Sequence, residues 1–231
     1  AMQIFQQLHM EAMMPNNVTF VNVILACANQ ADEKEGKHVH MRAIACNLEE
    51  NVVIGTALVD LYGKCGNVEE ARRLFNSLAE RDSFSWNAMI TAYVTCDVVE
   101  PALDCLNLMQ QEGVCPNDVT LICILKACRI IGDVDKGQEM HAQIETKGLS
   151  EKNLFISSAL VDMYVKCGLI AIARKVHSDL PVRNVVTWSI LIAGYVQQGK
   201  GHAALNSYEK MRSEGILPDA ITFTCILKAC G

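Results

Sequence analysis

TALVDLYGKCG, at residues 56–66, returns almost unchanged as SALVDMYVKCG at residues 158–168. Farther along the chain, FSWNAMITAYV at residues 84–94 returns as VTWSILIAGYV at residues 186–196. Both matches, and the two tryptophans of the chain, are separated by the same 102 residues. A fixed spacing of this kind marks an internal repeat, and a repeat decides the fold before any other feature does.

Each long repeat divides into three shorter units with a related pattern of apolar residues. The complete units are 35, 31 and 35 residues long, and then 36, 31 and 35. We place a partial unit at 1–16, complete units at 17–51, 52–82, 83–117, 118–153, 154–184 and 185–219, and the beginning of another at 220–231. No linker interrupts the series, so we expect a single domain over 1–231.

Within a unit the pattern predicts a helix, a turn and a second helix. In the unit 185–219, WSILIAGYV carries apolar residues along one helical face, and the glycines of QQGKGH end that helix. AALNSYEKMRSEG then forms a second amphipathic helix, which the proline of GILPD cannot continue. One hairpin cannot bury its apolar face, but stacked hairpins can. We therefore expect an all-α fold, a right-handed superhelical solenoid of helix-turn-helix repeats, with one helix of each pair lining the inside.

Composition narrows the possible functions. The net charge is −6, so any binding of nucleic acid must depend on local basic positions and on the bases themselves. The eleven cysteines include no C-x-x-C pair, so we expect reduced thiols and no metal site. No apolar run is long enough to cross a bilayer, so we expect no membrane partner. No catalytic constellation or phosphate-binding loop is present, so we expect neither an enzyme nor a cofactor.

The units resemble the pentatricopeptide-repeat family of land-plant organelles over almost the whole chain. VVTWSILIAGYVQQGKGHAALNSYEKMRSEGILPD (185–219) is similar to the standard motif of that family. LFISSALVDMYVKCGLIAIARKVHSDLPVRN (154–184) is similar to its short variant, and VTLICILKACRIIGDVDKGQEMHAQIETKG (119–148) to its long variant. The repeated order long, short, standard resembles the subfamily whose members mostly guide C-to-U RNA editing.

The resemblance implies single-stranded RNA as the ligand, bound at about one base per repeat and running parallel to the protein. In the family, the fifth and last residues of each motif select the base. The corresponding pairs here are Thr56 with Asp82 for G, Asn87 with Asn117 for C or U, Ser158 with Asn184 for A, and Ser189 with Asp219 for G. The long motifs offer the weaker pairs Val21 with Asn51 and Ile122 with Asn153, whose apolar fifth residues cannot hydrogen-bond a base. The expected ligand is 5′-NGYNAG-3′, with C preferred at Y.

Two further positions complete the interface that the resemblance implies. The second residue of each motif should stack against the bases, and these residues are Val53, Phe84, Val119, Phe155 and Val186. The thirteenth residue should face phosphate, and only Lys64 and Lys166 carry a cation there. For the phenylalanines a place in the core is an equal alternative. We assign Trp86 and Trp188 to packing between repeats.

Two alternatives remain open. Polar residues at these places are also ordinary N-caps and turn residues, although four recurring pairs favour base selection. The whole array could instead be a protein-interaction scaffold of tetratricopeptide type. The resemblance favours the RNA-recognition module of a longer RNA-processing factor in a mitochondrion or chloroplast. Other editing factors are possible partners, and the apolar ends of a solenoid could support self-association.

Overall fold

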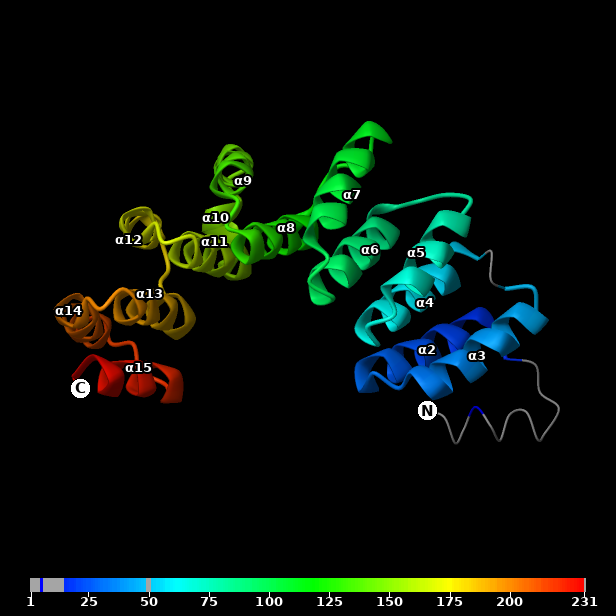
Figure 1. Ribbon diagram of the computed structural model, residues 1–231, viewed down its shortest axis with the longest axis horizontal. Coiled ribbons are helices and arrows are strands. Elements are labelled where there is room, and N and C mark those ends of the chain that lie inside the picture. The colour runs from blue at the N-terminus through cyan, green and yellow to red at the C-terminus, as the bar shows by residue number, and fades with distance from the viewer. Residues whose placement is uncertain (1–4, 6–14, 49–50, 231) are drawn as a thin grey trace. The chain divides into compact units, whose positions relative to one another are not determined.

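The computed structural model describes residue 5, residues 15–48 and residues 51–230, and every regular element in these ranges is a helix (Figure 1). The partial unit 1–16 therefore lies almost entirely outside the described residues. The chain divides into two compact units, residues 1–120 and residues 121–231. We describe each unit by itself.

Helices alternate between a first and a second member of a pair, and each first helix begins at the first residue of a sequence unit. The first helices are α2 (Asn17–Gln30), α4 (Val52–Lys64), α6 (Ser83–Thr95), α8 (Asp118–Ile131), α11 (Leu154–Lys166), α13 (Val185–Gln197) and α15 (Ala220–Cys230). The second helices are α3 (Glu33–Ala45), α5 (Val68–Ser77), α7 (Val99–Gln111), α9 (Val134–Thr146), α12 (Ile170–Asp179) and α14 (Gly201–Ser213). A short additional helix, α10 (Leu149–Lys152), lies in the sequence unit 118–153, the complete unit that has 36 residues.

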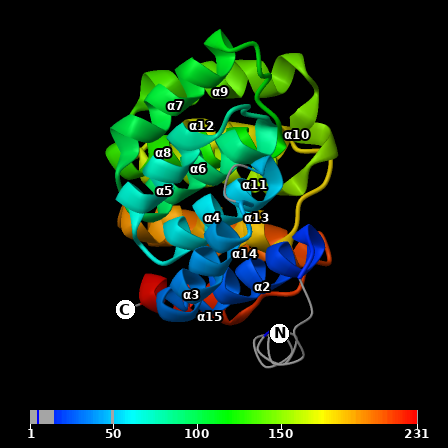
Figure 2. The ribbon, with the colours of Figure 1, turned by 90° about the vertical axis from the view of Figure 1, so that its right-hand side faces the viewer.

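Successive first helices pack on one another within each unit. In the first unit α4 contacts both α2 and α6, and in the second α13 contacts both α11 and α15. The second helices α3, α5, α7, α12 and α14 pack on the first helix of their own pair, as α2 with α3 shows in both views (Figures 1 and 2). The apolar face that one hairpin leaves open is thereby covered by the next hairpin.

Glycine in a left-handed conformation ends α4 and α11. Gly66 and Gly168 have φ values of 81° and 79°. Beyond them the backbone N–H groups of Asn67 and Leu169 each donate to the carbonyl of a tyrosine in the preceding helix at 2.9 Å. These bonds satisfy carbonyls at the end of each helix and turn the chain back into the second helix.

Aromatic side chains join one pair to the next. Trp86 is 1% exposed and meets the ring of Phe75, on α5 of the preceding pair, with ring centroids 4.8 Å apart. Trp188 meets His177 of α12 in the same way, with ring centroids 4.3 Å apart. The prediction that both tryptophans pack between repeats is confirmed by these contacts.

Two histidines that occupy equivalent positions in the repeat also join one helix pair to the next. Nδ1 of His40 lies 2.9 Å from the hydroxyl of Tyr62, which joins α3 to α4. Nδ1 of His141 lies 2.9 Å from the hydroxyl of Tyr164, which joins α9 to α11. Both pairs are therefore structural hydrogen bonds between a long motif and the short motif that follows.

One close contact between successive first helices places a glycine on one of the two helices, and the helix that carries the glycine differs between the two compact units. In the first unit a Cβ at Gly63 of α4 would clash with Cβ of Ala92 on α6 and lie 3.0 Å from its Cα. In the second unit the equivalent residues are Val165 and Gly194, and a Cβ at Gly194 would lie 2.6 Å from Cγ1 of Val165. Each unit thus combines one glycine with one larger neighbour, in opposite order.

This exchange predicts a non-additive pair of substitutions. We expect Gly63→Val alone to lower the free energy of unfolding by about 2 kcal/mol, because the added side chain meets the backbone of α6. Ala92→Gly alone should cost about 1 kcal/mol through helix propensity. The double variant reproduces the Val165–Gly194 pair and should be more stable than Gly63→Val alone. Urea unfolding of the four proteins measures the coupling, and purely additive losses would contradict this account of the packing.

Candidate nucleic-acid interface

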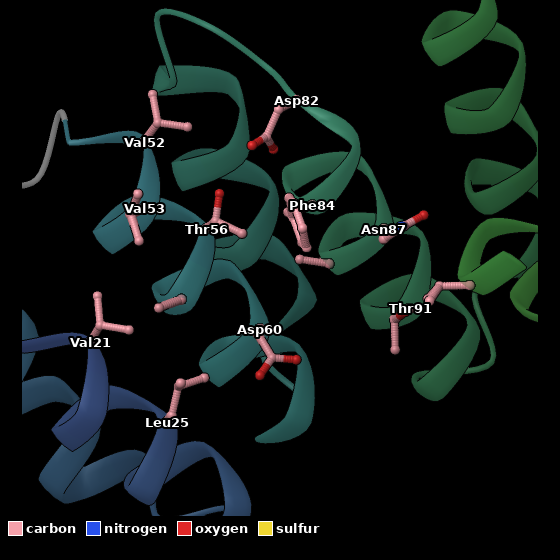
Figure 3. Close-up of a pocket in the computed structure, with 13 residues that line it drawn as sticks. Val21, Leu25, Val52, Val53, Thr56, Asp60, Asp82, Phe84, Asn87 and Thr91 are labelled. Carbon is pink, nitrogen blue, oxygen red and sulfur yellow. The ribbon is translucent and has the colours of Figure 1, made fainter. Parts of the chain in front are cut away.

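A groove of about 600 Å³ runs across the first helices of the first unit (Figure 3). Its lining comes from α2, α4 and α6, with Val119 at the beginning of α8. Figure 3 shows Val53, Thr56, Asp82 and Phe84 around this one space. The second, fifth and last residues of the short motif thus lie on the same side of the helices.

The second unit has two smaller grooves built on the same plan. One of about 260 Å³ is lined by residues of α8, α11 and α13, including Ile122, Phe155 and Ser158. The other, of about 180 Å³, is lined by residues of α11 and α13 together with Asp219 and Ile221. The same motif positions therefore face a groove in both units.

The second residue of every described first helix is an exposed apolar side chain. The five that the sequence predicted for stacking, Val53, Phe84, Val119, Phe155 and Val186, are between 48% and 78% exposed. A core position is therefore wrong for both phenylalanines. Val18 and Ile221 occupy the same position of α2 and α15 and are 66% and 62% exposed. The sequence interpretation omitted these two, although the register of the repeat was sufficient to find them.

The last residue of each motif caps the first helix of the next motif. A side-chain oxygen of each one accepts from a backbone N–H in the first turn, at 2.8–3.4 Å. These residues are Asn51, Asp82, Asn117, Asn153, Asn184 and Asp219. The N-cap interpretation of these residues is therefore correct as a description of local structure. It leaves base selection open, because the capping bond uses one oxygen and neither the N–H groups of an amide nor the second oxygen of a carboxylate.

Two of the four predicted base-selecting pairs are in direct contact. Nδ2 of Asn87 donates to Oδ1 of Asn117 at 3.0 Å. The hydroxyl of Ser189 lies 3.4 Å from Oδ1 of Asp219. The fifth residue of each pair is largely buried, with Asn87 8% and Ser189 5% exposed. In these motifs the last residue therefore offers the more accessible polar group.

The other two pairs are arranged differently. Oγ1 of Thr56 is buried without a hydrogen-bond partner among the described residues, and Thr56 lines the large groove together with Asp82. The hydroxyl of Ser158 donates to the carbonyl of Leu154 at 2.7 Å, within its own helix. Val21 and Ile122, the apolar fifth residues of the long motifs, line grooves without adding a polar group.

Both predicted phosphate-binding lysines lie on first helices and are exposed. The Nζ of Lys64 is 2.7 Å from Oδ2 of Asp60, which lines the large groove. Asp162 is the equivalent acidic residue of α11, and it pairs with Arg129 of α8 at 3.3 Å. The sequence interpretation omitted Arg129, which lines a groove beside Ser158. Only the contact across the helices identifies it.

Charge in the grooves also includes the carboxylate of Asp219. The hydrogen bond from the backbone N–H of Thr222, helped by the hydroxyls of Thr222 and Ser189, lowers the pKa of Asp219 below its usual value. This side chain is therefore an ionised acceptor at neutral pH. In the described part of the chain, no group of His, Cys, Asp and Glu is placed to hold a metal ion, and no helix has the length and apolarity to span a membrane.

Comparison with known repeat families gives matches along most of the chain. The pattern described as the PPR repeat family matches residues 81–129 and 183–231, and the pattern described as the PPR repeat matches residues 56–83. The pentatricopeptide repeat-containing protein At1g03540 of Arabidopsis thaliana is 35% identical over 100% of this chain and 37% of its own length. The chloroplastic protein At4g18520 of the same plant is 34% identical over 94% of this chain and 35% of its own length. The chain thus spans about a third of the length of these relatives.

Solved structures show the same fold. The crystal structure of the pentatricopeptide repeat protein PPR10 in complex with an 18-nt psaJ RNA element matches 99% of this chain and 34% of its own, with a TM-score of 0.84 and 20% identity. The crystal structure of PPR10 from maize matches with a TM-score of 0.58 and 21% identity. This likeness confirms the expected all-α solenoid fold of helix-turn-helix repeats.

The capping geometry predicts that Asp82 stabilises the protein through a side-chain oxygen that accepts a hydrogen bond, and that its charge is not needed for this. Asp82→Ala removes the acceptor for the N–H of Ser85 and should lower the free energy of unfolding by about 1 kcal/mol. Asp82→Asn keeps a capping oxygen and should stay within a few tenths of a kcal/mol of the unsubstituted protein. Chemical denaturation of both variants measures this, and equal losses would contradict the assigned cap.

Proposed function

Because the chain belongs to the pentatricopeptide-repeat family, we propose that its first helices bind single-stranded RNA with about one base to each repeat. The observation that carries the proposal is the row of exposed apolar side chains at the second position, beside the polar fifth and last residues. Apolar surfaces repeated along a groove give successive bases a place to stack. The RNA complex of PPR10, which has the same fold, supports the same use of the repeat.

The polar groups beside this row support the base assignments. A carboxylate at the last position, as in Asp82 and Asp219, accepts hydrogen bonds and suits the N–H donors of G. The amide of Asn184 both donates and accepts, which suits A. The amides of Asn87 and Asn117 suit the acceptors of a pyrimidine. The ligand we propose remains 5′-NGYNAG-3′.

We also infer that the chain is the recognition part of a longer organellar RNA-processing factor of the C-to-U editing type. The alternating motif lengths support this subfamily. The relatives named chloroplastic or mitochondrial support an organelle as the location. The competing function is a protein-interaction scaffold, which the net charge of −6 and the apolar lining of the large groove favour.

A binding titration tests the proposal. The RNA 5′-UUUAGCAAGUUU-3′ contains the proposed sequence, and each single mismatch at its G, C, A or final G should cost roughly 1–3 kcal/mol of binding free energy. Asp219→Asn should shift the preference at the final base from G towards A, because an amide replaces an acceptor-only group. Fluorescence anisotropy with the four bases at that position measures the shift.

The matched control is Asp104→Asn, which makes the same charge change on the exposed face of α7, outside the grooves. It should leave base preference unchanged. Equal affinity for all RNAs contradicts sequence-selective binding. No binding to any RNA at about 50 mM salt contradicts RNA binding altogether and favours the protein-interaction scaffold.

Lys64 should contribute affinity without selectivity. We expect Lys64→Gln to weaken every RNA alike and to reduce the slope of log K against log salt by about one, because one phosphate contact is lost. Lys34→Gln is the control, since Lys34 is exposed on the second helix α3. Titrations at several salt concentrations measure both slopes, and a loss confined to one RNA sequence would contradict the assigned role.

A further inference from the structure

The third residue of the first helix carries a hydroxyl group in every long or standard motif. These residues are Thr19, Ser85, Thr120, Thr187 and Thr222, whereas the two short motifs have Ile54 and Ile156. Ser85, Thr120, Thr187 and Thr222 are completely buried. A buried hydroxyl needs hydrogen-bond partners, and the partners differ from one motif to another.

Thr120 joins both polar residues of the preceding motif. Its Oγ1 donates to Oδ1 of Asn87 at 2.6 Å and accepts from the backbone N–H of Asn117 at 3.1 Å. The same Oγ1 lies 3.2 Å from Oδ1 of Asn117. The hydroxyl thus belongs to one motif and contacts the base-selecting pair of another.

These bonds fix which way each amide points. Oδ1 of Asn87 is occupied by Thr120, and Nδ2 donates to Oδ1 of Asn117. That oxygen also accepts from the backbone N–H groups of Val119 and Thr120 at 3.0 and 3.2 Å. The oxygens of both amides are therefore used inside the protein, and the N–H groups of Asn117, which have no partner among the described residues, are left for a base. A pair that offers a base N–H donors and no free oxygen matches the O2 and N3 atoms of cytosine, which accept hydrogen bonds.

Thr222 makes the corresponding network around Asp219. Its hydroxyl lies 2.7 Å from Oδ1 of Asp219 and 2.7 Å from Oγ of Ser189. The backbone N–H of Thr222 donates to the same Oδ1 at 2.8 Å. Among the described residues, every hydrogen bond of this carboxylate goes to Oδ1, so Oδ2 keeps its capacity to accept from a base. Acceptors without donors match the N–H groups of guanine.

After a short motif, the hydroxyl of the equivalent residue does not contact a base-selecting side chain. The Thr187 hydroxyl donates to the backbone carbonyl of Asn184 at 3.1 Å. It also accepts from the backbone N–H of Asn184. Ser158, the fifth residue of that motif, donates to the carbonyl of Leu154, as Ser189 does to that of Val185, but no hydrogen bond among the described residues joins it to Asn184 or Thr187. Thr187 therefore serves the helix terminus only.

We propose that Thr120 and Thr222 are positioning residues for base recognition by the standard motifs that precede them. Each hydroxyl sets the orientation of the fifth and last side chains, so that the Asn87–Asn117 pair presents donors and the Ser189–Asp219 pair presents an acceptor. Recognition by a standard motif then involves a third side chain, contributed by the next repeat. This proposal rests on the proposed function, since it concerns how the same groove selects a base.

Thr120→Val tests the proposal with little change of shape. Without the hydroxyl, Oδ1 of Asn87 loses its partner, and the Asn87–Asn117 pair is no longer held in the orientation that presents donors. The preference for C over A at the C of 5′-UUUAGCAAGUUU-3′ should then fall roughly 3- to 10-fold, the range of one hydrogen bond. Preferences at the other bases should not change. Thr120→Ser keeps the hydroxyl and should restore the preference. Anisotropy titrations with A and C at that base measure the ratio for each variant.

Thr187→Val is the matched control, because it removes a buried hydroxyl from the same motif position and the same helix turn. It should leave the preference for A at the fifth base of 5′-NGYNAG-3′ unchanged. Thermal melting should show a similar loss of stability in Thr187→Val and Thr120→Val. Thr222→Val should reduce the preference for G over A at the sixth base only. Selective binding by the unsubstituted chain with unchanged ratios in Thr120→Val and Thr222→Val would overturn this inference alone. Failure of the unsubstituted chain to bind RNA would overturn the proposed function.

Discussion

A side-chain oxygen at the end of each motif accepts from the first backbone N–H groups of the next first helix, and this bond sets the register of the interface. The first turn of a helix leaves N–H groups without partners, so a cap at that place determines where the helix begins. Asn51 and Asp82 show the result, because α4 and α6 begin at the residues that follow them. Once the first residue is fixed, the second points outward and the fifth lies about one turn further along the same face. The exposed apolar row and the polar residues beside it are both consequences of that one bond.

The cap also explains why the three kinds of motif are not equivalent. After a standard motif, a polar fifth residue reaches the cap and the buried threonine beyond it, as in the Asn87–Asn117–Thr120 network. After a short motif, the hydroxyl beyond the cap bonds to the backbone of the cap. After a long motif, the fifth residue is apolar and the third residue of the next helix is isoleucine. Polar contact between repeats is therefore concentrated at the standard motifs, and we expect base selection to be best defined there.

Much of the fold was predictable because the repeat itself carries the information. The recurrence of TALVDLYGKCG places each first helix, and the tryptophans two residues beyond the second position mark the packing of one pair on the next. The interface was predictable only as far as register determines it. Partners across helices were not, because nothing in a motif says that Asp162 of α11 pairs with Arg129 of α8, whereas the equivalent Asp60 pairs with Lys64 of its own helix. The burial of Asn87 depends in the same way on a threonine 33 residues away.

The same ion pairs bear on how a chain of net charge −6 could bind RNA. Two cations of the first helices already face carboxylates, with Lys64 at 2.7 Å from Asp60 and Arg129 at 3.3 Å from Asp162. Exposed ion pairs contribute little stability, so a phosphate could replace the carboxylate at small cost, but the carboxylate would remain nearby and oppose it. The net negative charge of the chain acts in the same direction, so under the proposed function the long-range attraction to phosphate is weak. Since that attraction acts on every sequence alike, its weakness lowers non-specific binding more than it lowers selectivity. Stacking on the apolar row and hydrogen bonds to base edges must then supply most of the binding free energy. This places the discrimination between RNAs in the orientation of a few buried amides and hydroxyls.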